Sequence, residues 1–247
     1  MVVMWGLFIR VLIGEGYFIA DINGMGWFLG VIGTVYTLFA AFIIVQVWGQ
    51  FSGVSLLVAK EAKVISTLWN LTNYLNDKKL DEEIRQALDE YCKSVIERES
   101  REAAMMTRSV HPSVELTRVH AILDEVKFND KRDGVIFPLL AQAFEELSDV
   151  RSERIEAGVT RLPGLLKRFF AFLSLLLFVS FSLIGFVSVY LYLFTLVMGG
   201  IVVAFAFFIA NDLDNPFDGE WNVDFTAIEQ ARKYVETFEH GKENKLV

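Results

Sequence analysis

Side chains that could bind a metal or act as a nucleophile are scarce in this chain. It contains three histidines and one cysteine among 247 residues. Glu115 and His120 are five residues apart, and His111 and His120 are nine apart, so neither pair has the spacing of ligands on one helix face. No strand pattern is recognisable, and therefore no glycine-rich phosphate loop follows a strand. We predict that the protein is not an enzyme and has no cofactor, with calcium as the exception considered next.

A group of candidate oxygen ligands for a metal ion follows the last apolar segment. Acidic side chains and backbone carbonyls are the ligands that Ca²⁺ prefers, but their spacing here is not that of an EF-hand. An acidic helix terminator, fixed by Pro216 and Gly219, is the favoured interpretation, and a calcium site is the alternative. The four acidic residues of this turn are Asp212, Asp214, Asp218 and Glu220.

The elements around this turn are predicted from where charge is absent. Residues 27–47 and 169–210 contain no charged residue, whereas 52–168 hold 18 of the 23 Lys and Arg and 20 of the 31 Asp and Glu. About 20 apolar residues cross the roughly 30 Å hydrocarbon core of a bilayer. One helix of 42 residues would be about 63 Å long. The second window should therefore be a hairpin with its turn near 185–188, and the chain has at least three spans.

The positions of basic residues predict the topology of a multi-pass protein of the plasma membrane. Arg161, Lys167 and Arg168 precede the hairpin, and Lys60 and Lys63 follow the first long span, so these ends face the cytoplasm under the positive-inside rule. We expect an N-terminal membrane segment over 1–51, a cytosolic domain over 52–168, the hairpin over 169–210 and a cytosolic acidic tail over 211–247. Residues 1–20, although they contain Arg10 and Glu15, could form a fourth span or an interfacial helix.

Helical periodicity predicts that the cytosolic domain is all-α. Apolar residues recur at steps of three and four, as on one face of a helix. Pro138 would then have to lie in the first turn of its helix. A third stripe, from 57 to 75, continues without proline from the first span, so one helix is expected to run from the membrane into the cytosol. The other two apolar stripes of this domain are Ile84, Leu88, Tyr91 and Val95 in one helix, and Ile136, Leu140, Ala143, Phe144, Leu147 and Val150 in another.

Overall charge excludes some partners. The net charge is −8, and no basic cluster is large enough to displace many phosphate counterions, which argues against nucleic acid. The two charge-free windows predict that the lipid bilayer is one partner of the chain. The hairpin contains no acid or base of the kind that proton-coupled carriers place at mid-membrane, which favours a passive route for permeant ions.

Small and polar residues line one face of the predicted helix 27–48, which Trp27 and Trp48 bracket as an aromatic belt would. They include Gly30, Thr34, Thr37 and Ala41, at steps of three and four. In an oligomer, this face would line a pore. Close packing against another helix is the equally weighted alternative, because small residues allow membrane helices to approach each other.

The stretch 31–61, with Val-Trp-Gly-Gln-Phe at 47–51 and Glu61-Ala62, resembles the second span of bestrophins and is similar still more closely to the bestrophin-like membrane proteins of bacteria and archaea. The cytosolic helical domain, the late hairpin and the Asn-Pro-Phe turn at 215–217 agree with it. The resemblance implies a homopentameric anion channel, such as a chloride channel. The bulky apolar residues that narrow the bestrophin pore, aligned on Trp48, correspond to Gly30, Thr34 and Leu38. Only Leu38 is bulky, so the narrow neck would be widened or displaced here. The acidic run after the turn is shorter than the calcium clasp of animal bestrophins.

Two functions are therefore predicted from different classes. The first is a subunit of a homo-oligomeric, anion-conducting channel whose pore is lined by 27–48 and extended by cytosolic helices. The second is a membrane-anchored signalling or scaffold protein whose cytosolic helices bind a partner. The sign of the permeant ion does not follow from charge, since the cytosolic domain and the tail are both net acidic whereas the resemblance implies anions. The gating stimulus and the subunit number do not follow from the sequence either.

Overall fold

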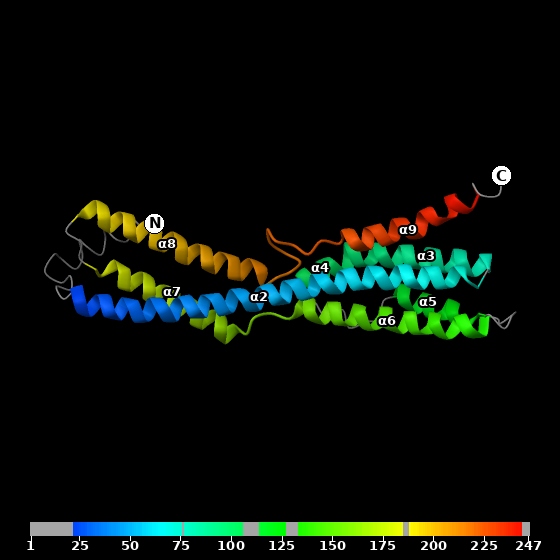
Figure 1. Cartoon of the computed structure of the whole chain (residues 1–247), viewed down its shortest axis with the longest axis horizontal. Helices are drawn as coiled ribbons and strands as arrows, with labels where there is room; N and C mark the ends of the chain where they lie inside the picture. Colours follow the sequence, from blue (N-terminus) through cyan, green and yellow to red (C-terminus); the bar gives the residue numbers. More distant parts are fainter. Residues whose placement is uncertain (1–21, 76, 106–113, 127–132, 185–187, 244–247) are drawn as a thin grey trace. The chain divides into compact units, whose positions relative to one another are not determined.

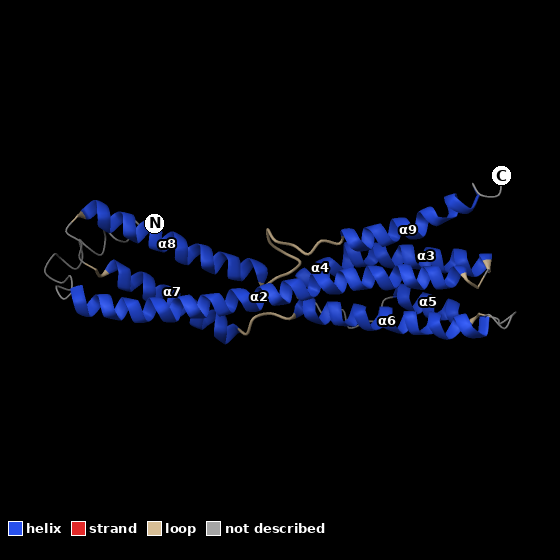
Figure 2. Cartoon of the chain, viewed as in Figure 1, coloured by secondary structure: helices blue, strands red, loops and turns tan. Residues whose placement is uncertain are grey.

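The computed structural model describes residues 22–75, 77–105, 114–126, 133–184 and 188–243. Over these residues the chain forms helices, turns and loops and no strand (Figure 2). The prediction of an all-α membrane protein is confirmed. The question of a fourth span in 1–20, the hairpin turn at 185–187 and His111 lie outside the described residues. The chain divides into two compact units, which are described separately: Met1–Gly49 with Arg161–Asp214, and Gln50–Thr160 with Asn215–Val247.

The first unit, here called the membrane unit, contains the beginning of α2 (Ile22–Asn73) together with α7 (Gly164–Ser182) and α8 (Val189–Leu213) (Figure 1). The last two helices pack against each other as the predicted hairpin. Near its turn, the Tyr192 hydroxyl donates to the Ser182 carbonyl at 3.2 Å. Aromatic rings join the helices, because apolar side chains of this size fill the space between them without polar atoms.

Three helical stretches of the described chain are long and apolar enough to cross a membrane. They are Met25–Asn73, Gly134–Ser182 and Val189–Leu213. The second includes two helices, and its apolar part is α7. The sequence prediction of at least three spans agrees with this finding, which rests on length and composition.

The second unit combines the rest of α2 with shorter helices. They are α3 (Lys78–Ser94), η2 (Val95–Glu99, a π-helical turn), α4 (Ser100–Ala104), α5 (Val114–Asp124), α6 (Asp133–Val159) and α9 (Thr226–Glu243). Asp77 caps α3, since its side chain accepts from the backbone N–H groups of Lys79 and Leu80. The stripe Ile84, Leu88, Tyr91 and Val95 is fully buried in one core that also includes residues of α2, α5, α6 and α9.

Two details of the second unit differ from the sequence-based expectation. Pro138 lies in the second turn of α6 and not in the first, because the helix begins at Asp133. A proline there removes one backbone hydrogen bond of the helix, which a proline in the first turn would not do. Helix α9, within the tail expected to be merely acidic, packs on α3 and contributes Ile228, Ala231 and Val235 to the core.

Candidate functional site

The residues predicted to line a pore share one uncovered face of α2. Gly30, Thr34, Thr37, Leu38 and Ala41 are all exposed in the single chain, and Leu38 is 68% exposed. At about 100° per residue, they span roughly one quarter of the helix circumference. No charged residue belongs to this face. We call these five residues the small-residue face.

A different side of the same helix packs inside the membrane unit. Its buried residues are Tyr36, Ala40, Ile43 and Val47, again at steps of three and four. The Tyr36 ring stacks on Phe170, with centroids 5.7 Å apart, and Phe170 in turn stacks on Phe207 at 5.7 Å. This aromatic packing fixes the rotation of α2 and thereby leaves the small-residue face outward.

The glycines on this part of α2 have open space around them. A Cβ atom built on Gly26, Gly30, Gly33 or Gly49 would meet nothing within 4 Å. Close packing against the described residues of the same chain therefore does not explain why glycine stands at these positions. An approach by another helix, or a lumen, would explain it.

The two threonines of the face hydrogen-bond to their own helix. The Thr34 hydroxyl donates to the Gly30 carbonyl and the Thr37 hydroxyl donates to the Gly33 carbonyl, both at 2.8 Å. Each hydroxyl proton is thus used by the backbone, and the oxygen lone pairs remain. The face has no free charge with which to attract an ion of either sign.

The acidic turn after α8 is used first as a structural clasp. The carboxylate of Asp214, which is buried, accepts from the backbone N–H of Leu162 at 2.6 Å and pairs with the Lys167 ammonium at 2.5 Å. These contacts join the end of α8 to the beginning of α7. A buried carboxylate is stable here because both of its oxygens have donors.

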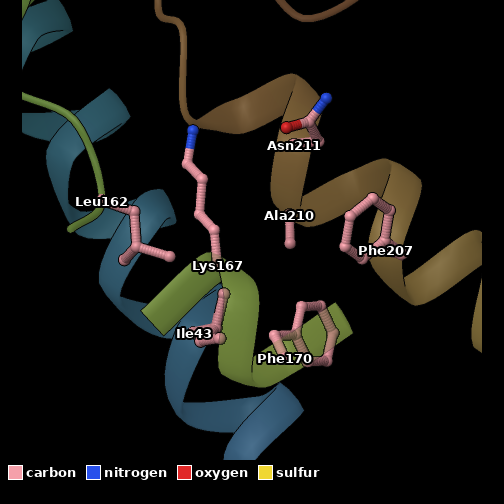
Figure 3. Close-up of a pocket in the computed structure, with 7 residues that line it drawn as sticks. All are labelled: Ile43, Leu162, Lys167, Phe170, Phe207, Ala210 and Asn211. Atoms are coloured by element: carbon pink, nitrogen blue, oxygen red, sulfur yellow. The ribbon is translucent and has the colours of Figure 1, made fainter. Parts of the chain in front are cut away.

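A small pocket lies beside this clasp within the membrane unit (Figure 3). Its walls are mostly apolar, from Ile43, Phe170 and Phe207, and the Lys167 side chain extends along it from α7. Asn211 stands at its polar end. The pocket has one charged group, already paired with Asp214, so it offers no catalytic pair of acid and base.

The predicted calcium ligands are divided between the two units. Within the described part of the chain, no three His, Cys, Asp or Glu side chains are placed to hold a metal ion. Asp212 and Asp214 belong to the membrane unit, whereas Asp218 and Glu220 belong to the second unit. Calcium binding here stays a prediction, and it would require Asp214 to exchange the Lys167 ammonium for the ion. Gly219, at φ 132°, has the backbone geometry that favours glycine, as expected of the turn.

The second unit contains a buried charge network that was not predicted from the sequence. Arg154, which is 0% exposed, donates through Nε to Glu61 Oε2 at 2.5 Å and through Nη2 to Glu99 Oε2 at 2.6 Å. Arg151 donates to the other oxygen of Glu99, and the Tyr91 hydroxyl donates to Glu61. We call these five residues the buried network. It ties α2, α3, η2 and α6 together.

The protonation states of this network follow from its pairing. Burial alone would raise the pKa of Glu99, but the charges of Arg154 and Arg151 outweigh it and lower that pKa. Burial, and then the charge of Glu61, raise the pKa of Tyr91 well above its ordinary value. Glu99 and Arg154 are therefore held in their charged forms, while the Tyr91 phenol stays neutral and donates.

A signal for the network was present in the apolar stripes. Val95 is followed four residues later by Glu99, and Val150 by Arg154, so each charged residue takes the next position on a buried face. A charge at a stripe position predicts either the end of the buried face or a buried pair. In this protein, Glu99 and Arg154 form a buried ion pair.

The histidine and cysteine side chains that the structure describes form no reactive centre. His120 is exposed and lies 3.5 Å from Asp124, within α5. Cys92 is buried, and burial raises the pKa of its thiol to about 12. A thiol in this state is a poor nucleophile at neutral pH.

Fold and composition define the class first: this is a helical integral membrane protein with a second, charged helical unit. A family model described as a bestrophin-like domain matches residues 18–228. Since this is most of the chain, the protein belongs to the bestrophin-like family. The comparison with curated proteins gave no match.

Solved structures share the fold at low sequence identity. One variant of a bacterial bestrophin homologue from Klebsiella pneumoniae is 15% identical, with a TM-score of 0.69 over 95% of this chain and 98% of that chain. A second variant of that homologue is 14% identical, with a TM-score of 0.68 over 95% and 94%. A structure described as a membrane protein is 13% identical, with a TM-score of 0.69 over 95% and 98%.

Proposed function

We propose that the protein is one subunit of a homo-oligomeric ion channel, pentameric and anion-conducting, with the small-residue face of α2 lining its pore. Helices of the second unit extend the conduit on the cytoplasmic side. Chloride is the natural test anion. Membership of the bestrophin-like family supports a channel, and the three candidate spans of the described residues are too few to enclose a pathway in one copy.

One observation carries the pore assignment: an uncharged, small-residue face is left outward while aromatic packing occupies another side of the same helix. Copies arranged around an axis with this face inward would leave room for water. The open space around Gly30 is consistent with that arrangement. Bulky exposed residues such as Phe42, at 57% exposure, would then face lipid or another helix.

Cysteine accessibility tests the assignment directly. Cys92 is buried, with its thiol pKa raised to about 12, so the natural chain provides a background of low thiol reactivity. In Ala41→Cys and Thr34→Cys oligomers reconstituted in planar bilayers, a charged, membrane-impermeant thiol reagent should block the current. Phe42→Cys is the matched control, one residue away on the bulky side, and its current should persist.

Two results would overturn the proposal. An oligomer of verified mass that conducts no ion at any voltage would remove the channel function and favour the scaffold alternative. Block at Phe42→Cys without block at Ala41→Cys would instead leave a channel whose pore is lined by another face. The mass of the complex in detergent tests the subunit number separately.

A further inference from the structure

Helix α2 presents charge of a single sign on its surface. Its 52 residues contain three charged side chains, Lys60, Glu61 and Lys63. Glu61 is fully buried and bonded to Arg154 and Tyr91, so its negative charge is compensated inside the second unit. The two lysines are exposed.

The two lysines differ in their partners. Lys60 lies 3.9 Å from Glu146 of α6. Lys63 has neither an ion pair nor a side-chain hydrogen bond within the described part of the chain, and its ammonium is free to act on a mobile ion. Such a charge, when repeated around a symmetry axis, produces a field that concentrates counter-ions.

The position of Lys63 on the helix agrees with that role. Ser52, Leu56, Ala59 and Thr67 are exposed on the same side of α2, at steps of three and four from Lys63. Lys60 is displaced by about 60° from Lys63, towards α6.

We propose that Lys63 of each subunit lines the cytoplasmic part of the conduit and forms a ring of positive charge that makes the channel prefer anions. This inference rests on the proposed channel function and deepens it. The small-residue face has no charge and its threonine protons are used by the backbone, so selectivity needs a charged group elsewhere on the pore helix. Lys63 supplies that group.

The test measures reversal potentials in asymmetric chloride salt for the full-length oligomer. Lys63→Gln should lower the anion-to-cation permeability ratio by about tenfold. This is the lower end of the increase in local counter-ion concentration that a passage lined by charge of one sign produces. Lys63→Glu should move the reversal potential past zero, towards the equilibrium potential of the cation. Both changes should weaken in high salt, where the Debye length falls to about 3 Å at 1 M.

Lys79→Gln is the matched control, because it removes the same charge from an exposed lysine of α3 in the same unit. Its reversal potential should equal that of the natural protein. If the natural oligomer conducts and Lys63→Glu leaves the reversal potential unchanged, the ring is refuted while the channel stands. If the natural oligomer does not conduct, the channel function itself fails, and the ring with it.

Discussion

The two units use polarity in opposite ways. On α2 in the membrane unit, small and uncharged residues face outward while aromatic rings pack inward. The second unit buries two arginines and two glutamates at its centre and surrounds them with apolar side chains. The outward face of the membrane unit is therefore available for function, whereas the buried charge in the second unit stabilises the fold.

The largest expected effect comes from breaking the buried network. Arg154→Met leaves Glu61 without its arginine and Glu99 with Arg151 alone, so the free energy of unfolding should fall by about 3–5 kcal/mol. Thermal and denaturant unfolding of the purified protein in detergent would measure it.

Arg118→Met is the control, since Arg118 pairs with Glu90 at 2.6 Å on the surface of the same unit. Its loss should cost less than about 1 kcal/mol. Equal costs for the two variants would contradict the view that burial distinguishes these pairs.

Two glycine variants, one in each unit, should differ in their effect on stability. A Cβ on Gly158 would come within 2.3 Å of the Phe217 ring, so Gly158→Ala should destabilise the second unit by about 1–3 kcal/mol. Gly30→Ala meets nothing among the described residues of its own chain and should leave the melting temperature of the isolated subunit unchanged. In the oligomer it should lower the single-channel conductance. A loss of assembly in place of altered conductance would favour helix packing over a lumen.

The clasp of Asp214 gives a smaller effect. Lys167→Gln removes the ammonium from a buried carboxylate and should cost about 1–2 kcal/mol, because the Leu162 N–H and a neutral amide still serve as donors. Calcium added to this variant should restore its melting temperature if the acidic turn binds the ion. No shift with millimolar calcium, in either the variant or the natural protein, would argue against a calcium site.

The smallest effect is a pH dependence. The pKa of Glu99 in the folded state lies below its ordinary value of 4.5, so the unfolded chain binds more protons between the two values. The stabilisation that ionised Glu99 provides is present above about pH 4.5 and is lost as pH falls through the pKa of Glu99 in the folded state. The gap in unfolding free energy between the natural protein and Glu99→Gln should narrow from pH 6 to pH 3, and a constant gap would be inconsistent with this pairing.

Much of the fold follows from sequence because lipid imposes a strict pattern. The charge-free windows predicted the spans, and the absence of proline after residue 51 predicted that α2 continues into the second unit, as it does to Asn73. The stripe at Ile84, Leu88, Tyr91 and Val95 predicted the buried face of α3.

The remaining features depend on contacts between distant residues. Glu61 and Arg154 are 93 positions apart, and each by itself reads as a surface charge. Helix α9 was missed because its apolar residues are sparse among acids, and its attachment through Arg232 to Asp89 spans 143 positions. For the pore, sequence spacing identified a face, and the structure adds that the face is exposed. The lining role remains a proposal.

The tryptophans at the two ends of the first span have a further consequence. Trp27 and Trp48 are 81% and 49% exposed, and 21 residues of helix place them about 31 Å apart along the axis. This length matches an average hydrocarbon core, and a thinner bilayer would make α2 tilt or the lipid deform. We therefore expect the channel to respond to membrane thickness, with an open probability that changes between short-chain and long-chain phospholipids of the same headgroup.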